Sequence, residues 1–147
     1  MFRKILLPVE HSAYDVGIVN YVRDLARDNG ASVLVFHVAD GFAARHLKEF
    51  DLRESEEVRE DREYVERIAA DLGASGLDVE CMLAAGDPAR EIRDAAQREG
   101  CDLIAMATHG HRFLKDLLFG SVANEVRHIS RVPVLLVLGT PPGKPPR

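Results

Sequence analysis

The chain has 147 residues, the length of one domain and enough to bury a hydrophobic core without disulfides or metals. Its residues are 46% hydrophobic and 29% charged, which is typical of a globular protein and not of a disordered or membrane-spanning one. The net charge of −5 argues against nucleic acid as the main partner, because binding the phosphate backbone requires a basic surface.

Five short apolar segments are expected to form strands. They are nearly continuous in Val, Ile and Leu, as in parallel strands that are covered on both faces. The segments are Ile5 to Val9, Ser32 to Val38, Val79 to Leu83, Leu103 to Ala107 and Val132 to Leu138.

Helical patterns fill the first two connections. The first helix is expected to open at Ser12, with Asp15 three residues on as a variant capping box, and to end near Gly30. The second is the charged segment from about Leu52 to Leu72. Its run from Arg53 to Arg62 mixes both signs of charge, which indicates a solvent-exposed helix face and not an interaction tail.

Two further helices follow. The third begins with Asp87 as its N-cap and Pro88 at its first position, and it ends at Gly100. The fourth is expected to begin near Gly120 and Ser121. The strict alternation of strands and helices predicts a single doubly wound, five-stranded parallel sheet with helices on both faces, a Rossmann-like α/β fold.

Two stretches depart from this pattern. Ala39 to Asp51 is a long connection, for which we expect a flap or a short helix. Gly139 to Arg147 is rich in Pro and Gly and is expected to be a disordered tail. The folded domain is therefore predicted to span residues 1–138, with residues 139–147 as the tail.

Composition also favours the cytoplasm. No apolar run approaches the roughly 20 residues of a membrane-spanning helix, so no membrane association is expected. The first residues enter a strand-like segment directly and lack the cleavage region of a signal peptide. The two cysteines, Cys81 and Cys101, form neither a disulfide framework nor a metal-binding pair, which fits a reducing compartment.

Ligands of open parallel sheets bind beyond the carboxyl ends of the strands, so ligand-binding residues are expected in the loops at that edge. The loop from Pro8 to Ser12 has no glycine, which excludes the dinucleotide-binding fingerprint at this place. The phosphate-binding P-loop, the nucleophile elbow, the zinc-protease motif and Cys-x-x-Cys are all absent from the chain. No catalytic residue is predicted.

The segment after the fourth strand has the features of an anion site. Gly110 has no Cβ, so the backbone there can approach a ligand closely. Gly120 and Ser121 are expected to open a helix whose first amide groups, near Val122 and Ala123, lack acceptors within the helix. Such a helix start binds phosphate readily.

This segment resembles the motif G-x-x-G-x9-G-[ST] of the ATP-binding members of the universal stress protein family. Gly110, nine further residues and Gly120-Ser121 are in register, whereas Ala107 stands in place of the first glycine. The resemblance covers nearly the whole folded chain. The other similar segments are Lys4 to Ser12, Phe36 to Val38, Gly86 to Pro88 and Val132 to Val137.

The resemblance implies an adenine nucleotide, ATP with ADP or AMP as alternatives, together with Mg²⁺. The family usually has Asp where this chain has Glu10, whose longer side chain would reach a ribose hydroxyl or Mg²⁺ from a shifted position. The resemblance does not assign the residues that would bind Mg²⁺. The implied binding residues are Pro8, Val9, Glu10, Val38, Met106, Ala107, His109, Gly110, His111, Gly120, Ser121, Val122 and Ala123.

The histidines of the chain have simpler interpretations than metal binding. His109 and His111 stand two residues apart without a third ligand, so we expect them to face phosphate or solvent. His37, at the end of the second strand, is expected to be a hydrogen-bonded core histidine. Glu10 has an alternative interpretation as a charge stabilised by the N-terminus of the first helix.

The last strand is long, apolar and predicted to lie at an edge of the sheet, where it invites pairing. The resemblance implies a homodimer with Val134 to Val137 near its centre and a role as a stress or energy-state responder. Two alternatives remain: an enzyme, as a slow ATPase or an adenylate-transferring enzyme, and a dimeric interaction module that has lost nucleotide binding. Ala107 and Glu10 motivate the second alternative.

Overall fold

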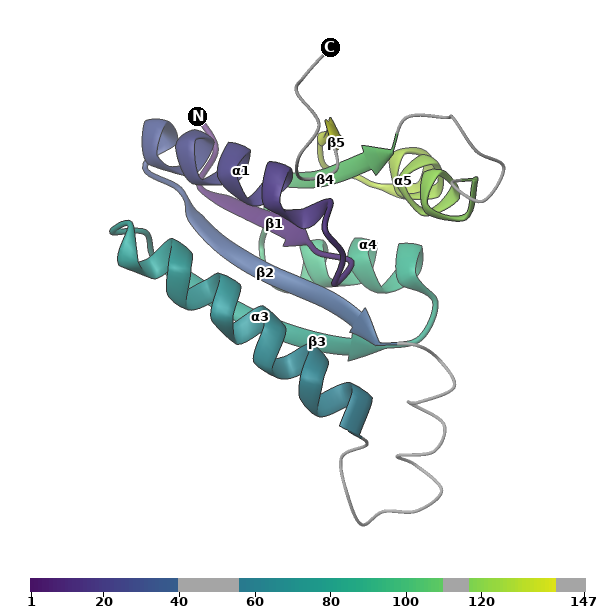
Figure 1. Cartoon of the computed structure of the whole chain (residues 1–147). Coiled ribbons are helices and arrows are strands. Elements are labelled where there is room, and N and C mark those ends of the chain that lie inside the picture. Colours follow the sequence, from purple (N-terminus) through teal and green to yellow (C-terminus); the bar gives the residue numbers. More distant parts are fainter. Residues whose placement is uncertain (40–55, 110–116, 140–147) are drawn as a thin grey trace.

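A computed structural model of the chain describes residues 1–39, 56–109 and 117–139. They form a parallel sheet in which the strand order is β3-β2-β1-β4-β5 (Figure 1). The expected doubly wound α/β fold is confirmed. The strands are β1 (Lys4–Pro8), β2 (Ser32–Ala39), β3 (Val79–Ala85), β4 (Leu103–His109) and β5 (Val134–Gly139).

Helices cover both faces of this sheet. The described helices are α1 (Asp15–Asn29), α3 (Glu56–Ala74), α4 (Pro88–Arg98) and α5 (Leu117–Ile129). Figure 1 shows α1 and α3 on one face and α4 and α5 on the other. Within the described ranges, none of these helices combines the length and the apolarity that crossing a membrane requires.

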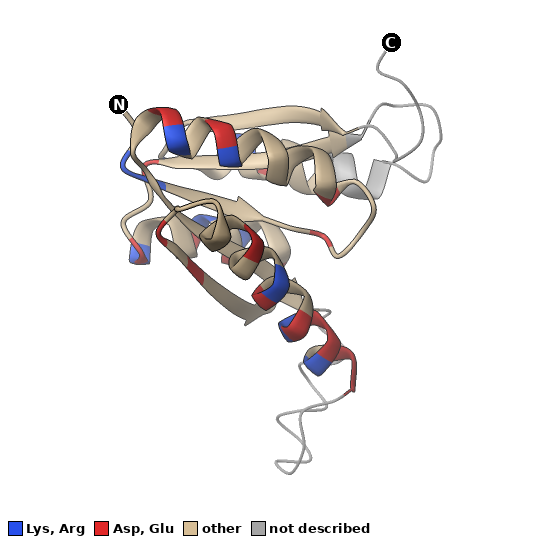
Figure 2. Cartoon of the chain, turned by 60° about the vertical axis from the view of Figure 1, so that its left-hand side comes forward, with Lys and Arg blue, Asp and Glu red and all other residues tan. Residues whose placement is uncertain are grey.

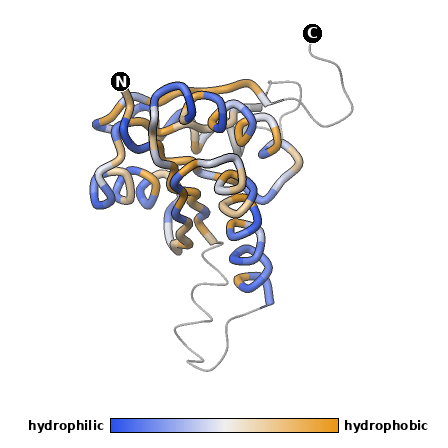
Figure 3. Tube along the Cα trace, turned by 90° about the vertical axis from the view of Figure 1, so that its left-hand side faces the viewer, coloured by the Kyte–Doolittle hydropathy of each residue, from blue (hydrophilic) through white to orange (hydrophobic). Residues whose placement is uncertain are grey.

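The central strands supply apolar side chains to both layers. In β1, Ile5 and Leu7 pack on the face covered by α1 and α3, and Leu6 packs on the face covered by α4 and α5. All three side chains are fully buried. Hydrophobic residues therefore predominate along the central strands but alternate with hydrophilic ones along the helices (Figure 3).

Helix α3 carries most of its charge on the side away from the sheet. Figure 2 shows acidic residues gathered toward its N-terminal half. Val58, Val65 and Leu72 are its buried residues. The exposed acidic face agrees with the solvated helix predicted for this charged segment, which begins at Glu56 in the structure.

Local signals set the ends of α1 and α4. The Asp87 side chain accepts a hydrogen bond from the Arg90 amide at 3.1 Å, and Pro88 follows as the first helical residue. Gly30 ends α1 in the left-handed region, with φ of 65°. Both predicted signals are confirmed. They could be predicted because each depends only on residues close together in the sequence.

The predicted start of the tail is wrong. Gly139 is a buried residue of β5 and not the start of a tail, so the folded region extends at least one residue further. A Cβ at Gly139 would lie 3.1 Å from Cδ1 of Tyr14, which shows how closely the start of α1 packs on the end of β5. The predicted flap before α3 and the remainder of the predicted tail lie outside the described residues.

We predict that Asp87→Ala lowers the free energy of unfolding by about 1 kcal/mol, because the Arg90 amide loses its acceptor. Urea denaturation measures this change. Asp87→Asn is the control, since Asn caps helices as well as Asp and should leave stability nearly unchanged. Equal losses in the two variants would contradict a capping role.

Candidate functional site

β1 and β4 separate toward their carboxyl ends. Among the described residues they pair only at Ile5 with Leu103 and at Leu6 with Ile104, although each strand continues further. The strand order also reverses here: β2 and β3 lie on one side of β1, whereas β4 and β5 lie on its other side. This is the topological switch point, the place where open α/β sheets bind ligands.

The β1 side of the switch point carries Pro8, Val9 and Glu10. Pro8 and Val9 are buried, and the Val9 amide donates to the Phe36 carbonyl at 2.8 Å, which extends the contact with β2 past the last residue of β1. Glu10 is half-buried, and its Oε2 accepts a hydrogen bond from the Ser12 hydroxyl at 3.3 Å. The Glu10 carboxylate is therefore held near the end of the strand.

The predicted floor residues of β4 face opposite sides of the sheet. Met106 belongs to the core under α4 and α5, whereas Ala107 belongs to the core under α1 and α3, which also contains Val9. Each is only 7% exposed. The methyl group of Ala107 is thus part of the core.

The remaining strand residues of the predicted site lie near this edge. His109 is the last residue of β4 and is in register with Gly139. Val38, near the end of β2, is half-buried against the core under α4 and α5. Gly110 and His111 lie outside the described residues.

The predicted start of the last helix is wrong. α5 begins at Leu117, so Gly120 and Ser121 lie inside it. In this conformation the amide groups of Val122 and Ala123 face helical carbonyl acceptors four residues earlier. The reason is local: residues 117–119 are Leu-Leu-Phe, and one glycine costs a helix only about 1 kcal/mol.

The side chains beyond this point divide between surface and core. Ser121 is exposed, whereas Ala123 is buried on the side of α5 that packs against the sheet and Val122 is half-buried beside it. The structure therefore places Ser121 at the surface and commits Ala123 to packing.

A buried carboxylate shapes the loop between β1 and α1. Asp15 is 2% exposed and accepts hydrogen bonds from the amides of Glu10 at 3.0 Å, His11 at 2.9 Å and Ser12 at 3.1 Å. The Tyr64 hydroxyl of α3 donates a fourth bond, at 2.5 Å. The loop thus turns without glycine because three consecutive amides converge on one side chain.

Part of the predicted capping box is present in this arrangement. The Ser12 amide donates to Asp15, as the motif requires. The Ser12 hydroxyl, however, accepts from the amide of Tyr14 at 3.3 Å, and the N-cap residue is Tyr14, two residues later than expected. Asp15 consequently serves the whole loop and not Ser12 alone.

The environment of Tyr64 changes its acidity. Burial, followed by the hydrogen bond to the Asp15 carboxylate, raises the pKa of the Tyr64 hydroxyl well above its ordinary value. The hydroxyl therefore stays protonated and remains a donor to Asp15 at neutral pH. The Arg67 guanidinium carbon also lies 5.9 Å from the centroid of the Tyr64 ring.

His11 is held in an unusual backbone conformation. Of the described residues other than glycine, it alone has a positive φ, of 63°. Its Nδ1 lies 2.7 Å from Oδ1 of Asp61, and its ring stacks on Tyr64 with centroids 4.0 Å apart. Contacts to α3 stabilise a conformation that residues other than glycine rarely adopt.

Asp61 also approaches His37, on β2. Its second carboxylate oxygen lies 3.4 Å from Nε2 of His37, and Nδ1 of His37 donates to the Val9 carbonyl at 2.7 Å. The expectation that His37 is a hydrogen-bonded histidine is confirmed. Asp61 therefore connects to the residues on both sides of Glu10, to His11 directly and to Val9 through His37.

The contacts of Asp61 and Tyr64 with the loop after β1 were not predicted from the sequence, although the position of Asp61 in the sequence indicates a buried contact. It stands three residues after Val58 and four before Val65, on the buried stripe of α3. Asp15 similarly stands three residues before Ile18 on the buried stripe of α1. A carboxylate at an apolar position of a helix indicates a buried polar contact.

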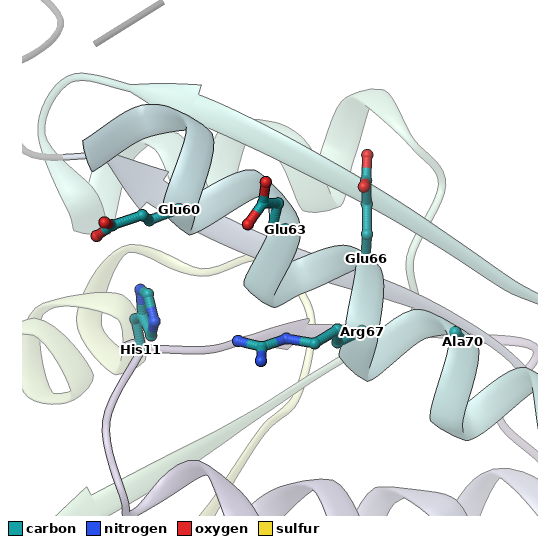
Figure 4. A pocket seen from close by; sticks show the side chains of 6 residues that line it. All are labelled: His11, Glu60, Glu63, Glu66, Arg67 and Ala70. Carbon is teal, nitrogen blue, oxygen red and sulfur yellow. The ribbon is translucent and has the colours of Figure 1, made fainter. Parts of the chain in front are cut away.

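A groove of about 570 Å³ adjoins this network (Figure 4). Its described lining comes from the loop after β1 and from α3, so it lies beside the switch point and not between β1 and β4. Within the described ranges, no group of three or more His, Cys, Asp or Glu side chains is arranged to hold a metal ion. The lining residues are His11, Glu60, Glu63, Glu66, Arg67 and Ala70.

Comparison with known proteins settles the family. The sequence matches the Universal stress protein family over residues 1–137. The chain belongs to this family. Among curated universal stress proteins, MJ0577 of Methanocaldococcus jannaschii is 29% identical, with 93% of this chain and 95% of that protein aligned.

Solved structures of universal stress proteins share the fold. The structure of MJ0577 superposes with a TM-score of 0.79 at 30% identity and covers 95% of this chain and 98% of its own. The universal stress protein from Archaeoglobus fulgidus in complex with dAMP gives a TM-score of 0.67 at 22% identity, covering 91% and 96%. A universal stress protein in complex with cAMP gives 0.67 at 18% identity, covering 95% and 98%.

We predict that Asp15→Asn lowers the free energy of unfolding by about 3 kcal/mol, because an amide NH₂ would face donors and leave buried N–H groups unpaired. Chemical denaturation measures the loss. Asp24→Asn, on the exposed side of α1, should change stability by less than about 0.5 kcal/mol. Similar losses in both variants would be inconsistent with a special role for Asp15.

Tyr64 should also give the stability a pH dependence. Its pKa is raised in the folded state, so its contribution is complete below the unfolded pKa of about 10 and is lost as the pH rises above it. The stability difference between the wild type and Tyr64→Phe should be constant from about pH 7 to 9 and shrink above about pH 10. Denaturation at several pH values tests this, and a difference that stays constant throughout contradicts it.

Proposed function

We propose that this universal stress protein binds an adenine nucleotide, ATP or alternatively ADP or AMP, at the switch point between β1 and β4. The observation that supports this proposal is the separation of the two strands at their carboxyl ends. There β1 leads into the segment with Glu10, and β4 leads into the segment with the glycine-serine motif. We further propose that the protein acts in the cytoplasm as a dimeric responder to stress or energy state.

The chemistry of the described residues suits the two halves of such a ligand. Val9 and Val38 offer apolar contact at the ends of β1 and β2 for the base. The half-buried Glu10 carboxylate would bind a ribose hydroxyl or Mg²⁺, which prefers oxygen ligands. Gly110, Gly120 and Ser121 would lie along the phosphates.

The start of α5 sets a condition on phosphate binding. The amide groups of Val122 and Ala123 can bind phosphate only if the helical turn from Leu117 to Gly120 opens, because that turn supplies their acceptors. Relatives with the same fold have been determined in complex with dAMP and cAMP, which supports adenine nucleotides as ligands this fold can accommodate. We assign no catalytic residue and expect any ATP hydrolysis to be slow.

A second candidate function is a dimeric interaction module that does not bind nucleotide. The observation that favours it is the continuous helix through Gly120 and Ser121, which occupies the amide groups that a phosphate would need. The two functions differ in one measurable property. Only a protein whose native state binds ATP is stabilised by it.

The proposed dimer uses the edge of the sheet at β5. Within the described chain β5 pairs with β4 alone, which leaves its other edge for a second copy. Leu138 is 63% exposed there, and Val134 to Val137 are only half-buried. Apolar residues on an unpaired strand favour association through that strand.

We predict that millimolar Mg-ATP raises the Tm of the wild type. At an ATP concentration of a hundred times Kd, the free energy of unfolding should increase by about 2.7 kcal/mol. Calorimetric titration should give one site per chain. Gly110→Val should weaken binding at least tenfold, as expected when a side chain obstructs close backbone approach; tenfold corresponds to about 1.4 kcal/mol.

Gly17→Val is the matched control, because a Cβ added at that position of α1 has no atom within 4 Å apart from its chain neighbours and the backbone of the helix. It should leave ATP binding unchanged. A wild-type Tm that ignores Mg-ATP, with no adenine nucleotide released on denaturing the purified protein, would support the interaction module instead.

We predict that the wild type elutes as a dimer in size-exclusion chromatography with light scattering at micromolar concentration. Leu138→Lys should shift it to a monomer, because a charge on the strand edge opposes pairing. Tyr21→Lys, at an exposed position of α1, should remain a dimer. A monomeric wild type would refute the proposed assembly.

A further inference from the structure

We propose that Tyr64 and Asp61 of α3 are positioning residues that hold the loop after β1 in its ligand-contacting conformation. The identity of the ligand rests on the proposed function, whereas the ordering of the loop is a property of the chain itself. The loop consists of Val9, Glu10, His11 and Ser12.

Tyr64 acts on the loop through Asp15. Its hydroxyl donates to Oδ2, the same oxygen that accepts from the amides of His11 and Ser12. The Glu10 amide donates to the other oxygen, Oδ1. The hydroxyl thus fixes the orientation of the carboxylate on which all three loop amides converge.

Asp61 acts on the loop through the two histidines. One oxygen contacts the ring of His11, which keeps that residue at its positive φ directly after Glu10. The other lies 3.4 Å from His37, which donates to the Val9 carbonyl directly before Glu10. Both peptide neighbours of Glu10 therefore depend on one side chain of α3.

The network closes into a ring. The His11 ring stacks on Tyr64. Asp61 and Tyr64 of α3 therefore restrain, and are restrained by, His11 and Asp15 of the loop region. Asp61 and Tyr64 stand one helical turn apart on α3, and Asp61 is 50 residues from His11 while Tyr64 is 49 residues from Asp15. Residues of one turn share a rigid frame, so the loop and α3 should respond to a ligand together.

Amide hydrogen exchange of the ligand-free protein tests the loop itself. In Tyr64→Phe and in Asp61→Asn, the amides of Glu10, His11 and Ser12 should exchange about tenfold faster than in the wild type. The amides of Leu6 and Ile104, in the paired part of the sheet, should keep their protection and so report an intact fold. Two separate variants keep the test decisive should one of them fail to fold.

Matched controls come from the same two residue types. Tyr21→Phe changes an exposed tyrosine of α1, and Asp71→Asn changes an α3 aspartate that pairs with Arg23, away from the loop. Neither should alter exchange of the loop amides. Equal protection of those amides in the wild type and both test variants would overturn the proposal.

Calorimetric ATP titration tests whether Tyr64 and Asp61 position the loop for ligand binding in addition to stabilising it. The Kd for ATP should rise about tenfold in Tyr64→Phe and Asp61→Asn and stay unchanged in the controls. In the wild type, ATP should slow exchange of α3 amides near Tyr64 and Val65, and this protection should be lost in the test variants. Faster loop exchange with unchanged Kd would overturn the positioning role.

Failure of the proposed function has a different signature, which is the absence of ATP binding by the wild type. Exchange of the loop amides then decides the inference alone. Faster exchange in the test variants supports loop ordering by α3, and unchanged exchange refutes it.

Discussion

The convergence of three consecutive loop amides on the Asp15 carboxylate gives the ligand edge of this protein its shape. Among the described residues Asp15 is the one charged side chain with almost no solvent exposure. Burying a carboxylate is unfavourable unless its oxygens are well hydrogen-bonded, and four donors meet that requirement here. The same bonds let the loop turn without glycine and hold the Glu10 backbone at the end of β1.

Helix α3 extends this constraint across the fold. Its Tyr64 and Asp61 contact the loop, while its apolar stripe packs on the sheet. One element therefore contributes both to the core and to the proposed site. Stability and ligand affinity should consequently be linked in this protein, because weakening the contacts to the loop loosens both. The groove beside His11 lies on the outer side of the same network.

The β4 and α5 side of the switch point is already packed and hydrogen-bonded within the fold. The methyl of Ala107 packs into the core, and α5 continues through Gly120 and Ser121. An adenine and ribose half would meet a preformed strand end at Val9, but a phosphate half would meet amides already bonded within a helix. Nucleotide binding would then include a local change at the first turn of α5, whose cost would subtract from affinity.

The sequence by itself determined the strands, the order of strands and helices, the cap at Asp87 and the stop at Gly30, because these depend on residues near one another in the chain. It also determined the family. Only the tertiary structure decided that Asp61 contacts His11, fifty residues away, since such pairing requires the packed arrangement of α3 and β1. The start of α5 was likewise decided by the folded chain, because a glycine permits a helix to begin but does not require it.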